Sequence, residues 1–410
     1  MMPFSKSKRK FRSRFSLNAE SDPLGMRKYS APLVAFVLAA ALRALYTIIA
    51  AFSVPHLLLL PALIRNNLFT EHLMDPTAGL AYSLLGVWGK FDTLNYLHIA
   101  QFGYDRPLIV VFFPLYPLLI RLLTPVFGNP LLTALVLSTF AAFFLFWGLL
   151  LLARLDFSDR IAMRAVLFYA LWPASFILFC GYAESLVLAL IVWSIYFART
   201  DRWWLSGLLG CMAPLAKAVG ILVVPALFIL ALRERRWRTL WAAFPLIGGA
   251  AYPLWLHLSG RLQWWEAYAM YWGTRTSWPW TTVLHSLQTA LRLLDVSNAT
   301  NPFQVMVAVG SALLYGLELA WVAIVFVLAL SKRLRLEYLL YSLAAIYIIL
   351  TKDSSISQQQ WTRYVLVLFP AAINFSLREK DGLLFAGFTA LGFAYNLLLM
   401  WFFLQWLLVV

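Results

Sequence analysis

Charged residues are scarce in this sequence. Of its 410 residues only 12% are Asp, Glu, Lys or Arg, against about 25% in soluble globular domains. Hydrophobic residues reach 62%, and the mean hydropathy is +0.77. So little charge cannot cover a water-exposed surface. The composition therefore excludes a soluble globular protein and indicates a chain that crosses a membrane several times.

Cysteine is scarce as well. The two cysteines, Cys180 and Cys211, cannot build a disulfide framework, and both lie in apolar runs where packing is their expected role. The sequence has no glycine-rich phosphate loop and no Cys/His cluster with the spacing of a metal centre. We therefore expect no cofactor and no metal centre, although the acids Asp75 and Asp105 leave a divalent cation open.

Basic residues outnumber acidic ones by 33 to 18, which gives a net charge of +15. In a soluble protein such an excess suggests nucleic acid. Here the basic residues gather in short connectors between apolar segments, a pattern that sets membrane orientation, so no nucleic acid partner is expected. Residues 1–29 contain "FSKSKRKFRSRF" without a cleavage site, and they are predicted to be a basic cytoplasmic tail that touches anionic lipid.

Apolar runs long enough to cross a bilayer as helices, about 20 residues each, recur along the chain. Residues 30–410 are therefore predicted to form a single all-α, polytopic transmembrane domain. About eleven spans are expected, at residues 31–52, 130–153, 161–180, 183–199, 203–217, 218–232, 239–258, 304–330, 337–351, 361–377 and 383–408.

The basic connectors all fall on one side if the N-terminus is cytoplasmic and if residues 110–128 do not cross the membrane. That stretch, "VVFFPLYPLLIRLLTPVFG", carries three prolines and an arginine, so it is predicted to lie on the outer surface as an interfacial helix. The exterior then holds two long segments, 53–129 and 259–303.

The stretch "WGKFDTLNYLHIAQFGY", residues 88–104, interrupts the apolar sequence with unusual chemistry. Asp92 stands among aromatic side chains that include Trp88 and Tyr96. A carboxylate in such surroundings is partly desolvated, which suits a general base, and the aromatic faces can hold a sugar ring or a prenyl chain. The alternative is an interfacial aromatic belt with one solvated aspartate.

Five other outer residues are candidate binding residues, each with a plainer alternative. Arg363 and Arg275 suit a phosphate group, or they touch lipid head groups at helix ends. Lys217 lies at a break between two short helices and needs a partner, either a phosphate or a structural carboxylate. Glu184 opens a helix, as a site residue or as a cap. His98 is a helper or sugar contact, or else a surface anchor.

Several segments in order resemble the PIG-V family of glycosyltransferases, over about residues 80–375. "FDTLNYLHIAQFGY" followed by "FFPLYPLLIRLL" is similar to the family's first-loop signature. "LWPASFILFCGYAESLVLAL", "YWGTRTSWPW" and "TRYVLVLFP" resemble its later segments. The resemblance implies a GT-C fold with amphipathic helices in the first outer loop, and it makes Asp92 the base.

The resemblance also implies an activity. It implies an inverting transfer of a sugar, normally mannose, from a polyprenyl- or dolichyl-phosphate donor to a lipid-linked or glycan acceptor. The site would face the outside of a membrane, here most simply a bacterial plasma membrane. Another lipid-phosphate sugar, such as glucose or arabinose, stays open, and so does a lipid or solute transporter. A transporter would show paired halves, and the sequence shows none.

Overall fold

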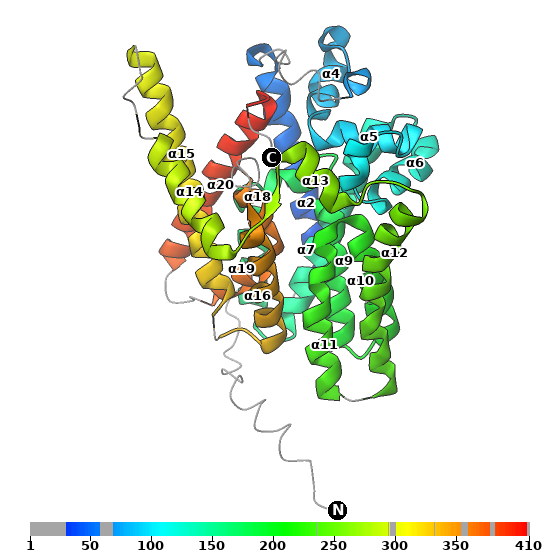
Figure 1. The fold of residues 1–410 in the computed structure, drawn as a ribbon. Coiled ribbons are helices and arrows are strands. Elements are labelled where there is room, and N and C mark those ends of the chain that lie inside the picture. Colours follow the sequence, from blue (N-terminus) through cyan, green and yellow to red (C-terminus); the bar gives the residue numbers. More distant parts are fainter. Residues whose placement is uncertain are drawn as a thin grey trace, which may run out of the picture.

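The computed structural model describes residues 30–57, 69–234, 236–293, 295, 301–331, 333–353, 360–377 and 382–407. The predicted tail, residues 1–29, and residues 58–68 of the first outer loop lie outside this described part. What is described is a helical bundle with shorter helices gathered at one end (Figure 1).

Every predicted span contains at least one helix. The main helices are α2 (Ala31–Ser53), α7 (Pro130–Arg154), α8 (Asp159–Ala170), α9 (Glu184–Arg199), α10 (Trp203–Ala216), α11 (Val223–Glu234), α12 (Phe244–Leu258), α15 (Pro302–Ala329), α16 (Leu336–Thr351), α18 (Trp361–Tyr364), α19 (Phe369–Ser376) and α20 (Gly382–Leu404). Short 3₁₀ helices join some of them: η2 (Val54–His56) follows α2, η8 (Ala218–Leu222) precedes α11, η9 (Trp237–Ala243) precedes α12, and η10 (Val365–Val367) lies between α18 and α19.

Five helical segments in the described part are long and apolar enough to cross a membrane. They are Ala31–His56, Pro130–Arg154, Trp237–Leu258, Gln304–Ala329 and Gly382–Leu404. These segments make the chain a multi-pass membrane protein. The figure of eleven crossings stays a prediction, because the remaining helices are shorter.

The predicted span 161–180 is wrong in its second half. Helix α8 ends at Ala170, and the chain then turns through Ala174, whose φ is 65°, into the 3₁₀ helix η7 (Ser175–Phe179). Pro173 explains the break, because a proline disfavours helical backbone at the residue before it. The apolar composition conceals this break, since the turn is itself fully buried.

The first outer segment folds into a series of short helices. They are η3 (Thr70–His72), η4 (Pro76–Ala78), α4 (Leu80–Leu84), η5 (Gly86–Trp88), α5 (Asp92–Phe102), η6 (Pro107–Val111) and α6 (Leu115–Phe127). With 13 residues, α6 is about 20 Å long, too short for a hydrocarbon core of about 30 Å. One face of α6 is anchored where Tyr116 hydrogen-bonds Ser138 of α7 at 2.6 Å, and the other exposes Leu118 and Leu122. These features fit the predicted interfacial helix.

The second outer segment contains α13 (Trp264–Trp272), β1 (Arg275–Thr276) and α14 (Pro279–Leu293). Strand β1 pairs antiparallel with β2 (Lys352–Asp353), which follows α16. Helix α13 lies at the same end of the bundle as α4, α5 and α6 (Figure 1). The described short helices of the first outer segment and α13 of the second therefore lie at one end of the bundle.

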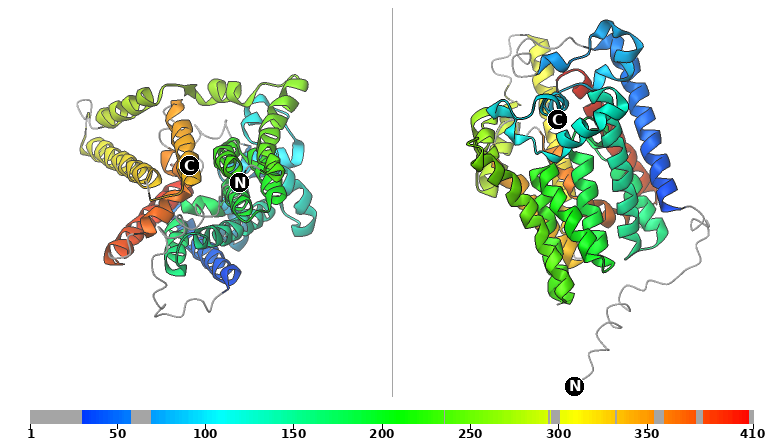
Figure 2. Two further views of the ribbon diagram at one scale, coloured as in Figure 1. Left: turned by 90° about the horizontal axis from the view of Figure 1, so that it is seen from below. Right: turned by 90° about the vertical axis from the view of Figure 1, so that its right-hand side faces the viewer.

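The basic connectors gather at the other end. Asp156, just after α7, accepts hydrogen bonds from Arg199 at 2.6 Å and from Arg335 at 3.1 Å. Glu337 is bound by Arg335 at 2.5 Å and by Arg233 at 3.0 Å. Four connectors that the charge pattern assigns to one side of the membrane are thus joined to one another. The bundle in between is seen along and across its axis in Figure 2.

Candidate functional site

Asp92 is placed by a sharp turn of the backbone. Phe91, immediately before it, has a φ of 47°, and α5 begins at Asp92 itself. Positive φ is uncommon for a bulky side chain and marks a locally strained position. The carboxylate lies in the first turn of α5, where the helix dipole favours negative charge, and it is 23% exposed.

Arg363 lies opposite Asp92 on the short helix α18. One guanidinium nitrogen, Nη2, is 2.6 Å from the Asp92 carboxylate, and Nε donates to Glu184 at 2.5 Å. The guanidinium carbon also lies 4.7 Å from the centre of the Tyr182 ring. The Arg363 side chain is only 5% exposed, and it is paired with both carboxylates.

Glu184 holds a second cation. Its Oε1 accepts a hydrogen bond of 2.5 Å from the ammonium of Lys217, which follows α10 where the chain turns into η8. The two alternatives for Lys217 were a phosphate and a carboxylate, and in this structure its partner is a carboxylate. Glu184 stands at the first position of α9, but it does more than cap that helix, because it joins Lys217 to Arg363.

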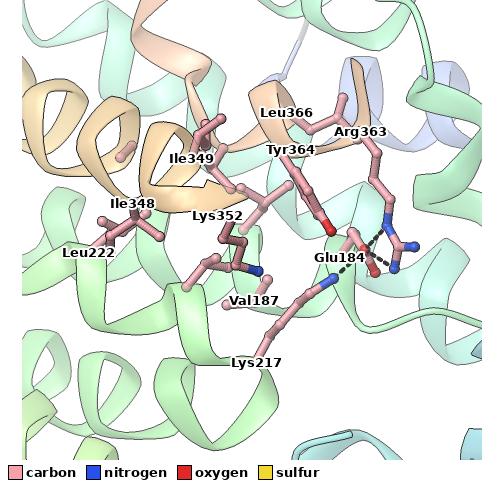
Figure 3. A pocket seen from close by; sticks show the side chains of 14 residues that line it. Glu184, Val187, Lys217, Leu222, Ile348, Ile349, Lys352, Arg363, Tyr364 and Leu366 are labelled. Atoms are coloured by element: carbon pink, nitrogen blue, oxygen red, sulfur yellow. Dashed lines mark hydrogen bonds and ion pairs between the residues drawn. The ribbon is translucent and has the colours of Figure 1, made fainter. Parts of the chain in front are cut away.

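A pocket opens beside these charges (Figure 3). Glu184, Lys217, Lys352, Arg363 and Tyr364 line its polar side. Its other walls are apolar and come mainly from α9, η8, α16 and η10: Val187, Leu188, Val219, Leu222, Ala345, Ile348, Ile349, Leu366 and Val367. Three cationic side chains and one carboxylate thus line an otherwise apolar pocket, an arrangement complementary to an amphiphile with an anionic head group.

Lys352 of β2 was not singled out from the sequence. Its ammonium lies 5.1 Å from the ring centre of Tyr268 and 4.9 Å from that of Tyr364. Burial lowers its pKa to about 8, and the positive charges of Lys217 and Arg363 add to this effect. The signal in the sequence is a lysine directly after an apolar helix, which also fits a side chain reaching out to lipid head groups.

Lys90 was also missed as a separate residue, although it lies inside the motif. It is 2% exposed, with its ammonium 4.0 Å from the centre of the Trp406 ring. Burial lowers its pKa to about 7. No carboxylate in the described part of the chain forms an ion pair with it, so the aromatic ring is the group that faces its charge.

The remaining predicted residues lie outside the charged cluster. Trp88 is buried beneath the guanidinium of Arg43, 4.7 Å from its ring centre. Tyr96 is buried between Phe112 and Tyr116, in edge contact with both rings. Both therefore pack beneath the site, and the prediction that they face a sugar stays untested.

His98 and Arg275 lie apart from the charged cluster. His98 is buried, so it is not a surface anchor, and it takes part in a different cluster with Glu71, His72 and Asp105. Arg275 is exposed on β1, and its guanidinium forms no ion pair with any described residue. Its strand pairs with that of Lys352, which leaves it beside the pocket rather than in it.

The fold and the site together define an all-helical, multi-pass membrane protein with a buried charged cluster and an adjoining amphiphilic pocket. Residues 105–259 match the family model described as dolichyl-phosphate-mannose-protein mannosyltransferase. This segment runs from the end of the first outer loop to α12 and contains Glu184 and Lys217, while Asp92 and Arg363 lie outside it. The match supports a membrane glycosyltransferase of the GT-C type that uses a polyprenyl-phosphate sugar. No curated protein matches the chain.

Proposed function

We propose that the protein is an inverting glycosyltransferase that moves a sugar, mannose, from a polyprenyl- or dolichyl-phosphate donor to a lipid-linked or glycan acceptor. The observation that carries this proposal is the contact of Asp92 with Arg363 at the edge of a pocket with cationic and apolar sides. The pocket offers positive charge for the phosphate and an apolar wall for the lipid chain. Asp92 offers a base for the acceptor hydroxyl.

The donor phosphate is proposed to bind among Arg363, Lys217 and Lys352. Arginine binds phosphate with two parallel hydrogen bonds, and lysine does so as a point charge. The first isoprene units would follow the apolar wall formed by residues such as Val187 and Ile348. Arg275, whose strand pairs with that of Lys352, is a further proposed contact at the rim.

Binding of the phosphate would change the partner of Arg363. The Nη2 that now donates to Asp92 would turn to a phosphate oxygen, which releases the carboxylate for the acceptor. Asp92 then takes the proton of the acceptor hydroxyl while the oxygen of that hydroxyl bonds to the anomeric carbon. The bond from that carbon to the phosphate oxygen breaks, and the polyprenyl phosphate leaves with the electron pair, stabilised by the surrounding cations.

Glu184 has a positioning role in this proposal. It is 6% exposed, and its Oε1 accepts hydrogen bonds from both Lys217 and Arg363, so it holds the two cations around one oxygen atom. A carboxylate so placed also neutralises part of their repulsion while the pocket holds no anion.

Membrane orientation belongs to the same proposal. We place the cluster on the outer face and the linked basic connectors in the cytoplasm, because cytoplasmic connectors carry an excess of Lys and Arg. A PIG-V-type enzyme of a bacterial plasma membrane fits this placement. A transporter is disfavoured, because Asp92 begins α5, a helix at the end of the bundle that also carries α13 (Figure 1), and because the sequence shows no paired halves.

The test is transfer of label from the donor. Purified protein is incubated with polyprenyl-phosphate-[¹⁴C]mannose and a lipid extract, and the label is followed into product. The proposal expects mannose to leave the donor; glucose or arabinose donors, supplied in parallel, report the alternative sugars. If no lipid-phosphate sugar loses its label to any acceptor in the extract, the proposal is overturned.

A further inference from the structure

A second cluster lies along α5, away from the charged pocket. It consists of Glu71 and His72 in η3, and of His98 in α5, with ligand atoms that all lie within 4.8 Å of one another. His72 and His98 are nearly buried, with 7% and 3% of their side chains exposed, whereas Glu71 is 47% exposed. Two buried imidazoles beside one carboxylate form a donor set of the kind that binds zinc.

We propose that Glu71, His72 and His98 bind a zinc ion. The distances between the three donor atoms are 3.3 Å for His72 Nε2 to His98 Nδ1, 3.1 Å for His98 Nδ1 to Glu71 Oε1, and 4.0 Å for His72 Nε2 to Glu71 Oε1. A tetrahedral zinc ion with bonds of about 2.0–2.2 Å sets its ligand atoms roughly 3.3–3.5 Å apart. Two of the three distances lie close to this range, and the third needs a small rotation of an exposed side chain.

Asp105 completes the arrangement from the other side of His98. Both of its carboxylate oxygens lie 3.0 Å from His98 Nε2. With the proton on Nε2 donated to Asp105, the lone pair of Nδ1 points toward Glu71 and His72. A histidine that binds metal through one nitrogen commonly donates its other N–H to a carboxylate, which fixes the tautomer and the ring orientation.

Aromatic side chains shield this site from water. Phe69 stacks on His98 with ring centres 3.7 Å apart, and Arg106 lies over the far face of the same phenyl ring. Phe102 contacts the rings of both histidines. Such an apolar surround strengthens metal–ligand bonds. The nitrogen-containing donor set favours zinc over Mg²⁺ or Ca²⁺, which prefer oxygen ligands.

The ion would fasten η3 to α5. His98 follows Asp92 by six residues, about 9 Å along the helix axis, so the ion lies beside the proposed reaction centre and not within it. Its role is to position α5, whose first residue is Asp92. The sequence did not reveal the cluster, because Glu71 and His98 lie 27 residues apart. The proposal does not depend on sugar transfer.

The experiment measures metal binding directly. Full-length protein purified in detergent is stripped with a chelator, dialysed, and titrated with zinc, and bound metal is measured by mass spectrometry. We expect about one zinc per chain and a rise in melting temperature. Cobalt in place of zinc should give the intense visible absorption of a tetrahedral site.

Variants assign the ligands. Glu71→Gln and His72→Ala should each weaken zinc binding at least about tenfold, and Asp105→Asn should weaken it about 10- to 100-fold. His257→Ala, an exposed histidine of α12, should bind zinc as the parent does. Glu71 is half exposed, so Glu71→Gln should stay folded. Elution of this variant as a single species in size-exclusion chromatography checks that it does. The proposal is overturned if the stripped parent takes up no zinc, or if folded Glu71→Gln and His72→Ala bind it unchanged.

Discussion

Arg363 and Asp92 are joined by a contact of 2.6 Å between Nη2 and Oδ2, although 271 residues separate them in the chain. The same guanidinium also binds Glu184, so one arginine holds two carboxylates. Arg363 also lines the proposed phosphate pocket, together with Lys217 and Lys352. The arrival of a phosphate, in our proposal, is what frees Asp92 for the acceptor.

Replacement of Arg363 should weaken donor binding and slow transfer. We expect Arg363→Ala to lower the rate about 10²- to 10³-fold, the effect of losing one fixed donor to a developing anion. Arg363→Lys should recover only part of this, because a point charge cannot reproduce two parallel hydrogen bonds. Donor affinity and turnover are measured for both. Arg292→Ala, at an exposed position on α14, is the control. If both Arg363 variants bind donor as the parent does, Arg363 does not contact the donor phosphate.

Replacement of Glu184 should destabilise the protein. Glu184→Gln removes the charge that Lys217 and Arg363 share, and breaking a buried ion pair by removing one partner costs about 3–5 kcal/mol. Thermal unfolding in detergent should show a lower melting temperature. Glu234→Gln, exposed at the other end of the bundle with a hydrogen bond from Trp203, should unfold close to the parent. Equal melting temperatures for all three proteins would argue against a structural role for Glu184.

Donor binding should depend on pH through Lys352. Its pKa of about 8 lies below the ordinary value because the side chain is buried, so it loses its proton as the pH rises from 7 to 9. We expect donor affinity to fall about tenfold over that interval, the contribution of a charged hydrogen bond. The free energy of unfolding should rise over the same interval. Above pH 8 the lysine of the unfolded chain still holds the proton that the folded one has released, so a higher pH favours the folded state.

Lys352→Arg is the matched variant for this pH dependence. Arginine keeps its charge throughout the interval, so its donor affinity should be nearly constant between pH 7 and 9. The affinities are measured by titration of protein with donor lipid in detergent. An unchanged pH profile in Lys352→Arg would show that another group is responsible.

The orientation of the bundle is testable by cysteine labelling. In a background without Cys180 and Cys211, single cysteines at Thr77 and Gln288 should react with an impermeant thiol reagent added to intact cells. One at Arg236, an exposed residue of the connector before the apolar segment Trp237–Leu258, should react only after the cells are opened. Labelling at Arg236 without labelling at Gln288 would place the site in the cytoplasm.

Much of the fold could be predicted from hydropathy and charge, because lipid contact imposes long apolar helices. The region after α8 could not, since Pro173 breaks the helix inside an apolar run that remains buried. α6 was recognisable as interfacial from its prolines and its arginine. The charge pattern also predicts that the basic connectors share one side of the membrane, and four of them are joined by ion pairs in the structure.

The charged residues of the candidate site can be picked out one by one in the sequence, but their contacts with one another cannot. Asp92, Glu184, Lys217 and Arg363 each stand out as charges at the edge of apolar segments. That they touch one another depends on how α5, α9, α10 and α18 pack, which no local pattern records. Lys352 was not predicted for the same reason. A lysine that follows an apolar helix does not indicate a binding residue unless its neighbours in the fold are known.

The most direct test of the account is transfer by Asp92→Asn. The change keeps size and most hydrogen bonding but removes the basic carboxylate, and general-base help contributes about 10²–10⁴-fold. Transfer of label from polyprenyl-phosphate-[¹⁴C]mannose should fall at least about a hundredfold, while the variant still folds and binds donor. Asp75→Asn, an exposed acid of the same loop that caps η4, should transfer as the parent does. Near-parental transfer by folded Asp92→Asn would contradict the claim that this carboxylate carries the chemistry.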